Sequence, residues 1–254
     1  MLHKIIENKR KEVEMSREKL PLHILKNKLT ISKRDFKGAI SKNKLNLIAE
    51  FKRKSPSQTI IDKNLEVQNI IRIYNKYADA VSVLTDKKFF STSLFDMKSI
   101  SGLTNLPVLR KDFIIDEYQI YESRFYNADS ILLIASILSR AEINNFIDTA
   151  KTYKMHCLVE VHTEDDLNKV LGTKAEIIGI NNRNLDTLEI DLNTTLRLAD
   201  RIPSGKVVVS ESGIQDRNYA EKIKNKANAM LVGSLFMNSE NIEKEILSLL
   251  PLIK

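Results

Sequence analysis

The stretch DSILLIASILSRAEINNFIDTAKTYKMHCLVEV, residues 129–161, predicts two β-strands joined by a helix. Its ends, DSILLI and HCLVEV, are short and largely apolar, which is typical of strands buried on both faces. Between them, Ile143, Phe146, Ile147 and Ala150 recur at helical spacing. A strand, a crossover helix and a second parallel strand form the repeating unit of α/β folds.

Similar apolar runs recur along the chain from residue 47, with starts 21 to 33 residues apart. They are LIAEF (47–51), AVSVL (80–84), PVLRK (107–111), DSILLI (129–134), HCLVEV (156–161), IIGIN (177–181), KVVVS (206–210) and NAMLV (228–232). Each interval holds one strand and one crossover helix. The eight units predict a single (β/α)8 barrel, a fold of the α/β class, over residues 47–254. An open doubly wound sheet is disfavoured, because no G-x-G-x-x-G motif follows the first run and no P-loop motif occurs.

Residues 1–46 precede the first run and account for the net positive charge of the chain. They hold 13 Lys and Arg against five Asp and Glu, whereas the whole chain of 254 residues has a net charge of +7. We expect a helical extension, broken at Pro21, that packs on the barrel mouth. Its charge is that of a solvated helix face, or of a positive rim that attracts an anionic ligand. No zinc-finger, RNP-like or helix-turn-helix pattern supports nucleic-acid binding.

Composition excludes several classes of protein. Apolar residues make up 43% of the chain, which excludes a mainly disordered state. The one cysteine, Cys157, excludes an internal disulfide framework and favours a reducing compartment. No run approaches the roughly 18–20 apolar residues of a membrane span, and the N-terminus lacks a secretory h-region. We therefore expect a cytoplasmic protein with no membrane contact and no obligate protein partner.

Polar residues interrupt the apolar runs at the end of several predicted strands. They are Glu50, Lys52, Lys111, Glu160, Asn181, Arg183 and Glu211. In a (β/α)8 barrel, the carboxyl ends of the strands meet at one rim, where function is located. Buried charges are costly unless they are paired, so the set favours a catalytic site over salt bridges that only close the barrel.

Two glycine-containing loops follow the last two strands. They carry Ser212-Gly213 and Gly233-Ser234, in the loops that usually bind phosphate in this fold. Phe90 and Phe113, beyond the second and third strands, are core residues or an apolar wall for a planar ring. The four His show no metal-ligand spacing, and His162, after the fifth strand, is interpreted as a surface or capping residue. We expect no metal and no cofactor.

These residues lie in segments that resemble the indole-3-glycerol-phosphate synthase family over nearly the whole chain. The segments are IAEFKRKSPS (48–57), VSVLTDKKFF (81–90), LPVLRKDFIIDEYQI (106–120), LVEVHTEDDL (158–167), IGINNRNLDTLEID (178–191), VSESGI (209–214) and LVGSLFM (231–237). The resemblance implies conversion of 1-(2-carboxyphenylamino)-1-deoxyribulose 5-phosphate, an anionic sugar phosphate, to indole-3-glycerol phosphate. Ring closure, loss of carbon dioxide and loss of water then proceed by Lys and Glu acid–base catalysis.

The resemblance also implies roles for individual residues. Lys111 is the general acid on the substrate ketone, and Glu160 is the acid–base group of the dehydration. Lys52 contacts the anionic groups of the substrate and is a second candidate for proton transfer. The remaining positions orient the reacting groups (Glu50, Asn181, Glu211), make carboxylate and polar contacts (Ser55, Arg183), bind phosphate (Ser212, Gly213, Gly233, Ser234), and form the apolar pocket around the ring (Pro56, Phe90, Phe113, Leu132, Leu188).

Two departures from the family pattern affect loops only. Gln58-Thr59 follow the Ser-Pro-Ser sequence, and Tyr77-Ala78-Asp79 precede the second strand, where many members carry Gly. Alternative functions are a Schiff-base aldolase, a phosphoribosyl isomerase, and a non-enzymatic binding module that uses residues 1–46. The phosphoribosyl isomerase of the tryptophan pathway, to which the synthase family also belongs, has a Cys general base at the position of Glu50.

Overall fold

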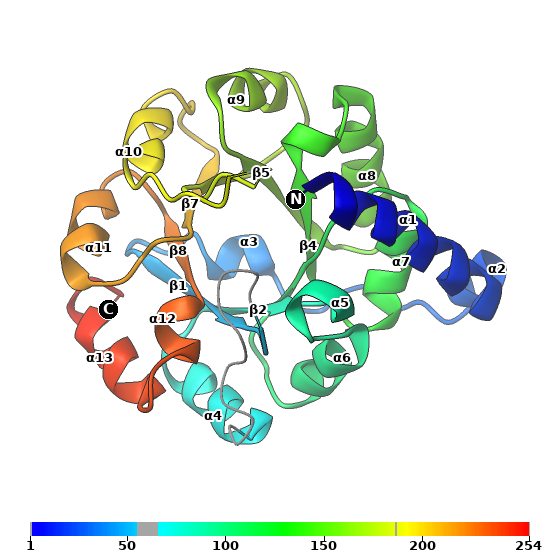
Figure 1. Cartoon of the computed structure of the whole chain (residues 1–254), viewed down its shortest axis with the longest axis horizontal. Helices are drawn as coiled ribbons and strands as arrows, with labels where there is room; N and C mark the ends of the chain where they lie inside the picture. The colour runs from blue at the N-terminus through cyan, green and yellow to red at the C-terminus, as the bar shows by residue number, and fades with distance from the viewer. Residues whose placement is uncertain (1, 55–65, 186, 254) are drawn as a thin grey trace.

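Eight parallel strands form a closed barrel in this computed structural model, which describes residues 2–54, 66–185 and 187–253 (Figure 1). The strands are β1 (Asn46–Phe51), β2 (Ala80–Leu84), β3 (Val108–Lys111), β4 (Ser130–Ile134), β5 (His156–Val161), β6 (Ile177–Asn181), β7 (Val207–Glu211) and β8 (Ala229–Val232). Each strand pairs in parallel with the next, and β8 closes the barrel against β1 with Asn46 opposite Ala229. The predicted (β/α)8 fold is confirmed.

Helices connect the strands and surround the barrel. Those that follow β1 are α4 (Val67–Tyr77), α5 (Lys87–Phe90), α6 (Leu94–Gly102), α7 (Tyr118–Phe125), η1 (Ala135–Ile137), α8 (Arg140–Thr152), α9 (Glu164–Leu171), α10 (Asn193–Ala199), α11 (Arg217–Ile223), α12 (Ser234–Met237) and α13 (Ile242–Ile253). Helix α8 illustrates how the local sequence forms these helices. Ser139 and Glu142 form a capping box at its start, and Ile143, Phe146 and Ala150 are its buried residues.

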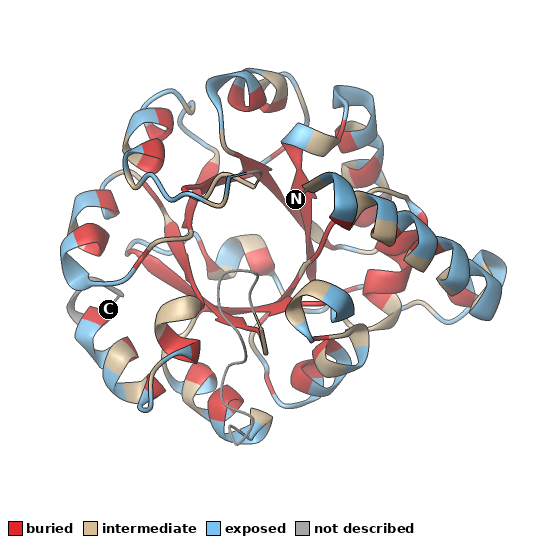
Figure 2. Cartoon of the chain, viewed as in Figure 1, coloured by how far each residue is buried: buried red, intermediate tan, exposed pale blue. Residues whose placement is uncertain are grey.

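Apolar side chains form one layer inside the barrel and another between the strands and the helices. Since side chains alternate along a strand, Ile48, Leu109 and Leu158 point inward, whereas Leu47 and Val159 face the helices. Figure 2 shows the same arrangement, with buried strands inside a ring of helices whose outer faces are exposed. No helix within residues 2–54, 66–185 and 187–253 is long and apolar enough to cross a membrane.

The N-terminal segment contacts both ends of the barrel. It contains α1 (Leu2–Lys19), α2 (Leu22–Lys26) and α3 (Phe36–Ala39), and α1 ends just before Pro21. Phe36 and Ile40 are fully buried and pack with the interior layer, and α3 is visible through the centre of the barrel in Figure 1. Helix α1 lies at the opposite end, where Leu2 lines a cavity. The division into an extension over 1–46 and a barrel over 47–254 stays a prediction.

Candidate active site

The polar residues predicted at the strand ends occupy interior positions at the carboxyl end of the barrel. Glu50, Lys111 and Glu160 each lie two residues beyond an inward-facing core residue, so they point to the same side of the strand. Asn181 and Glu211 end the neighbouring strands β6 and β7 and are paired in register. These five side chains therefore converge at the mouth of the barrel. Four of them, Glu50, Lys111, Glu160 and Asn181, line one cavity, and the fully buried Glu211 contacts Lys111.

Two lysines pair with different acidic residues of this site. The Lys111 ammonium lies 2.8 Å from Glu211 Oε2 and 3.3 Å from Glu160 Oε2. The Lys52 ammonium donates to Glu50 Oε1 at 2.8 Å and to Ser234 Oγ at 2.9 Å. Lys52 thus joins the acidic cluster to the loop after β8.

Burial and the neighbouring charges shift the pKa values of these groups. Burial opposes the charged form of Lys111, but Glu211, Glu160 and Glu50 outweigh it and raise the pKa of this ammonium. Burial raises the pKa of Glu211 to about 7, with help from Glu160 and Glu50 and against the pull of Lys111. Burial also acts on Glu50, but Lys52 and Lys111 outweigh it and lower the pKa of that carboxyl. Glu211 Oε1 is buried and has no hydrogen-bond partner among the described residues, in keeping with its raised pKa.

The cavity has a volume of about 550 Å³ and two chemically different sides. Its apolar wall includes the predicted residues Phe90, Phe113, Leu132 and Leu188. Its polar side consists of the lysines and acids at the strand ends together with the predicted loop residues Ser212, Gly213, Gly233 and Ser234. The cavity is therefore suited to a ligand that is apolar at one end and anionic at the other.

The loop after β7 has an unusual backbone conformation. Ser212 and Gly213 are both left-handed, with φ values of 66° and 78°. Asn182 stabilises this turn, because its buried carboxamide donates to the Ser212 carbonyl at 3.0 Å and accepts from the Thr195 amide at 3.0 Å. Successive backbone amides in such turns form anion-binding concavities.

Gly233 allows a close approach between the loop after β8 and the acidic cluster. A Cβ atom at this position would lie 2.2 Å from Glu50 Oε1. A larger residue would therefore displace Glu50, so this glycine serves the acidic cluster as well as the loop in which the sequence placed it.

The remaining predicted residues fall in two groups. Arg183 lines the cavity, donates to the Leu188 carbonyl at 2.9 Å, and pairs with Ile190 through an isolated β-bridge. Burial lowers the pKa of Arg183, with Glu50 acting in the opposite direction. Ser55 and Pro56 lie outside the described residues. His162 is part-buried, and its Nδ1 lies 2.7 Å from the Asn181 carbonyl oxygen, which orients it as a donor to that strand end.

Sequence analysis placed the N-terminal extension on the barrel mouth but named none of its residues as lining the cavity. Leu2 and Ile5 line it, although they lie more than 40 residues before the first strand. The residues of α1 that are buried are Ile5, Lys9 and Val13, which are spaced by four. A lysine within an apolar helical stripe indicates a buried ion pair, and this signal was available in the sequence.

The chain is similar to known proteins of one family. The family model for indole-3-glycerol phosphate synthase matches residues 2–249. The indole-3-glycerol phosphate synthase of Caldanaerobacter subterraneus subsp. tengcongensis is 43% identical over 94% of each chain. That of Endomicrobium trichonymphae is 40% identical over 97% of this chain and 98% of its own.

A solved structure supports the fold alone. The 3-hexulose-6-phosphate synthase of Salmonella typhimurium aligns with a TM-score of 0.62 at 13% identity, covering 82% of this chain and 98% of its own. The family match and the two synthase relatives establish that the chain belongs to the indole-3-glycerol phosphate synthase family.

Proposed function

We propose that this protein converts 1-(2-carboxyphenylamino)-1-deoxyribulose 5-phosphate to indole-3-glycerol phosphate, with Lys111 as the general acid. The observation that carries the proposal is the Lys111 ammonium, which lies between Glu160 and Glu211 in the cavity. Its pKa is raised by those carboxylates, so it remains a charged donor at neutral pH. As part of the same proposal, the substrate is an anionic sugar phosphate and the reaction takes place in the cytoplasm.

Ring closure begins with attack of the aromatic carbon that bears the carboxylate on the substrate ketone carbon. Lys111 donates a proton to the ketone oxygen as the carbon–carbon bond forms. A preorganised donor at such an oxyanion contributes about 3–4 kcal/mol. The carboxylate then leaves as carbon dioxide, and its bonding electrons restore the aromatic ring.

Loss of water completes the indole. The new hydroxyl group leaves as water after protonation, and the adjacent carbon loses a proton to form the double bond. Glu160, which lies 3.3 Å from Lys111, is placed to exchange protons in this step. General acid–base catalysis contributes roughly 10²–10⁴-fold to such a step. Glu50, Asn181 and Glu211 orient these groups in our proposal.

The two sides of the cavity bind the two ends of this substrate. Phe90, Phe113, Leu132 and Leu188 surround the aromatic ring, with Pro56 added by the family resemblance. The phosphate binds to the loops after β7 and β8 through Ser212, Gly213, Gly233 and Ser234, and Lys52, Arg183 and Ser55 contact the anionic groups. This division follows the apolar and polar sides of the cavity.

Indole fluorescence provides a direct test, because the chain contains no Trp. The purified protein should produce a fluorescent indole product from the substrate. Lys111→Met and Glu160→Gln should each lower kcat by about 10²-fold or more while far-UV circular dichroism stays unchanged. Near-normal turnover in both variants would refute the assignment of roles.

A Schiff-base aldolase is the main alternative function, and Lys111 distinguishes the two functions. A lysine that forms Schiff bases requires a lowered pKa, whereas the pKa of Lys111 is raised. Borohydride reduction with a carbonyl substrate should trap no adduct on Lys111 or Lys52. A trapped adduct would support the aldolase.

A further inference from the structure

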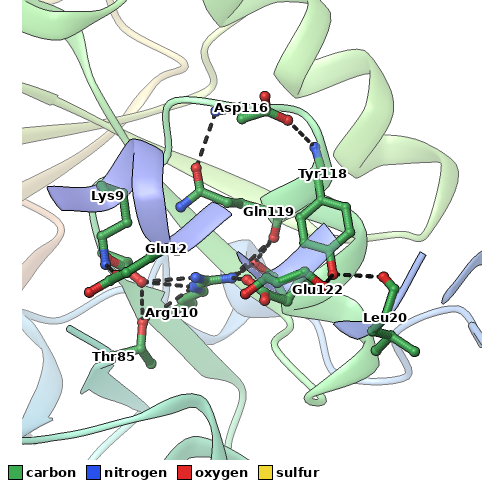
Figure 3. A network of polar contacts seen from close by, with 12 residues as sticks. Lys9, Glu12, Leu20, Thr85, Arg110, Asp116, Tyr118, Gln119 and Glu122 are labelled. Carbon is green, nitrogen blue, oxygen red and sulfur yellow. Dashed lines mark hydrogen bonds and ion pairs between the residues drawn. The ribbon is translucent and has the colours of Figure 1, made fainter. Parts of the chain in front are cut away.

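Lys9 places a buried charge between α1 and the barrel mouth. Only 2% of this residue is exposed. Its ammonium lies 2.8 Å from Asp112, 2.9 Å from Asp86 and 2.7 Å from Glu12 of its own helix. Figure 3 shows Lys9 reaching from α1 toward the polar group around Arg110 and Thr85. One side chain therefore joins the N-terminal helix to the ends of β2 and β3.

Asp112 connects Lys9 to the segment that follows Lys111. The Asp112 Oδ1 atom that Lys9 contacts also accepts the Phe113 amide at 2.8 Å. The second oxygen accepts from Arg110 Nη2 at 2.9 Å and from Thr85 Oγ1 at 2.7 Å. The position of Phe113 in the cavity wall is thus tied to the carboxylate that Lys9 neutralises.

Asp86 makes the equivalent connection to α5. This fully buried carboxylate contacts Lys9 through Oδ2, and its Oδ1 caps α5 by accepting the Phe89 amide at 2.8 Å. Helix α5 ends at Phe90, which lines the cavity. Asp86 has no other ion pair within the described part of the chain, so removal of Lys9 leaves its charge buried and uncompensated.

Helix α1 supplies the third part of the same wall. Ile5 lies one turn before Lys9 on the buried face of the helix and lines the cavity with Leu2. Since Lys9 is the buried charge that fixes this face, it sets the position of Ile5 relative to Phe90 and Phe113. The burial of Lys9 opposes its charge, but Asp112, Asp86 and Glu12 outweigh it and raise its pKa, so the ammonium stays charged.

We infer that Lys9 is a positioning residue that assembles the aromatic-binding wall of the cavity from three separate segments, acting through Asp86 and Asp112. The inference rests on the proposed function for the identity of the ring. The phosphate loops follow β7 and β8, and Lys111 is held by Glu160 and Glu211. Lys9 therefore governs binding of the ring and leaves phosphate binding and proton transfer largely unchanged.

The test compares Lys9→Met with Lys11→Met, a matched variant on the same helix. The Lys11 side chain is 69% exposed and contacts Glu7, four residues earlier. The probes are 2-aminobenzoate for the ring site and inorganic phosphate for the loops, measured by calorimetry and by inhibition of turnover. In Lys9→Met, KM and the Kd of 2-aminobenzoate should rise roughly tenfold or more, whereas kcat and the affinity for phosphate change by less than about threefold. Lys11→Met should match the wild type in every measurement.

Equal weakening of both probes, or no change in either, would overturn the inference. If Lys9→Met does not fold, Lys9→Gln serves instead, because its amide can still donate to one carboxylate. It should show the same selective loss for the ring probe. Hydrogen exchange gives a readout without turnover: the Phe89 and Phe113 amides should exchange faster in either Lys9 variant than in Lys11→Met. If the wild type lacks synthase activity, the proposed function fails, while the exchange and probe measurements still decide the role of Lys9.

Discussion

Glu211 should make the folded protein less stable as the pH rises, and Glu211→Gln should remove that dependence. Its pKa is about 7 in the folded chain, against an ordinary value of 4.5. Both states bind the proton below about pH 4, so the carboxyl has no effect on stability there. Between about pH 4.5 and 7 the unfolded chain releases its proton first, and stability is lost progressively as the pH rises.

The size of the effect follows from the two pKa values. One pKa unit corresponds to about 1.4 kcal/mol, so ionisation of Glu211 in the folded chain costs about 3 kcal/mol above pH 8. The amide of Glu211→Gln carries no charge and still offers an oxygen to Lys111. The difference in free energy of unfolding between variant and wild type should therefore grow in favour of the variant by roughly 2–3 kcal/mol from pH 5 to pH 8, because the unfolded chain is already partly ionised at pH 5. For a domain of this size, that corresponds to a change of roughly 4–12 °C in the Tm difference.

Urea unfolding followed by far-UV circular dichroism measures this difference at each pH. Glu221→Gln is the control, because the Glu221 side chain on α11 is 39% exposed and pairs with Lys224 just beyond the end of the helix. The difference between this variant and the wild type provides the reference at each pH. A Glu211→Gln difference that stays constant from about pH 5 to pH 8 would contradict the raised pKa and the charge arrangement from which it arises.

Three other substitutions or treatments test separate parts of the structure. Asn182→Leu removes the donor to the Ser212 carbonyl, so inorganic phosphate should bind about tenfold more weakly in calorimetry, with kcat changed less than KM. In the wild type, Arg34 lies 2.7 Å from the Asp129 carboxylate at the opposite end of the barrel. Asp129→Ala leaves the Arg34 charge unpaired, so the free energy of unfolding should fall by about 3–5 kcal/mol while KM stays unchanged. Burial raises the pKa of the Cys157 thiol, so a thiol reagent at about pH 8 should label it only after denaturant is added.

The positions of the strands were predictable because a single sequence pattern indicates them. Runs of apolar residues too short for a helix recur at crossover spacing, and β2, β5 and β6 have the predicted bounds. The parity of side chains along a strand then places Glu50 and Glu160 inside the barrel, which the structure bears out. The rim therefore followed from the strand pattern alone.

The parts that depend on tertiary contacts were not predictable in the same way. A helical stripe shows that a face of α1 is buried, but not that Ile5 meets the barrel mouth while Phe36 closes the other end. Asn182 was overlooked because it faces away from the barrel interior and acts through the Ser212 carbonyl. Gly233 was assigned to the phosphate loop, and its closeness to Glu50 depends on a pairing between β1 and β8 that spans the whole chain.

A crystal structure with a non-cyclising analogue, in which the substrate ketone is reduced to an alcohol, tests the central arrangement most directly. We expect the alcohol oxygen at hydrogen-bond distance from Lys111, the ring against Phe90 and Phe113, and the phosphate on the amides of the Ser212-Gly213 turn. An analogue bound with its phosphate away from this turn, or with its alcohol oxygen out of reach of Lys111, would contradict the account.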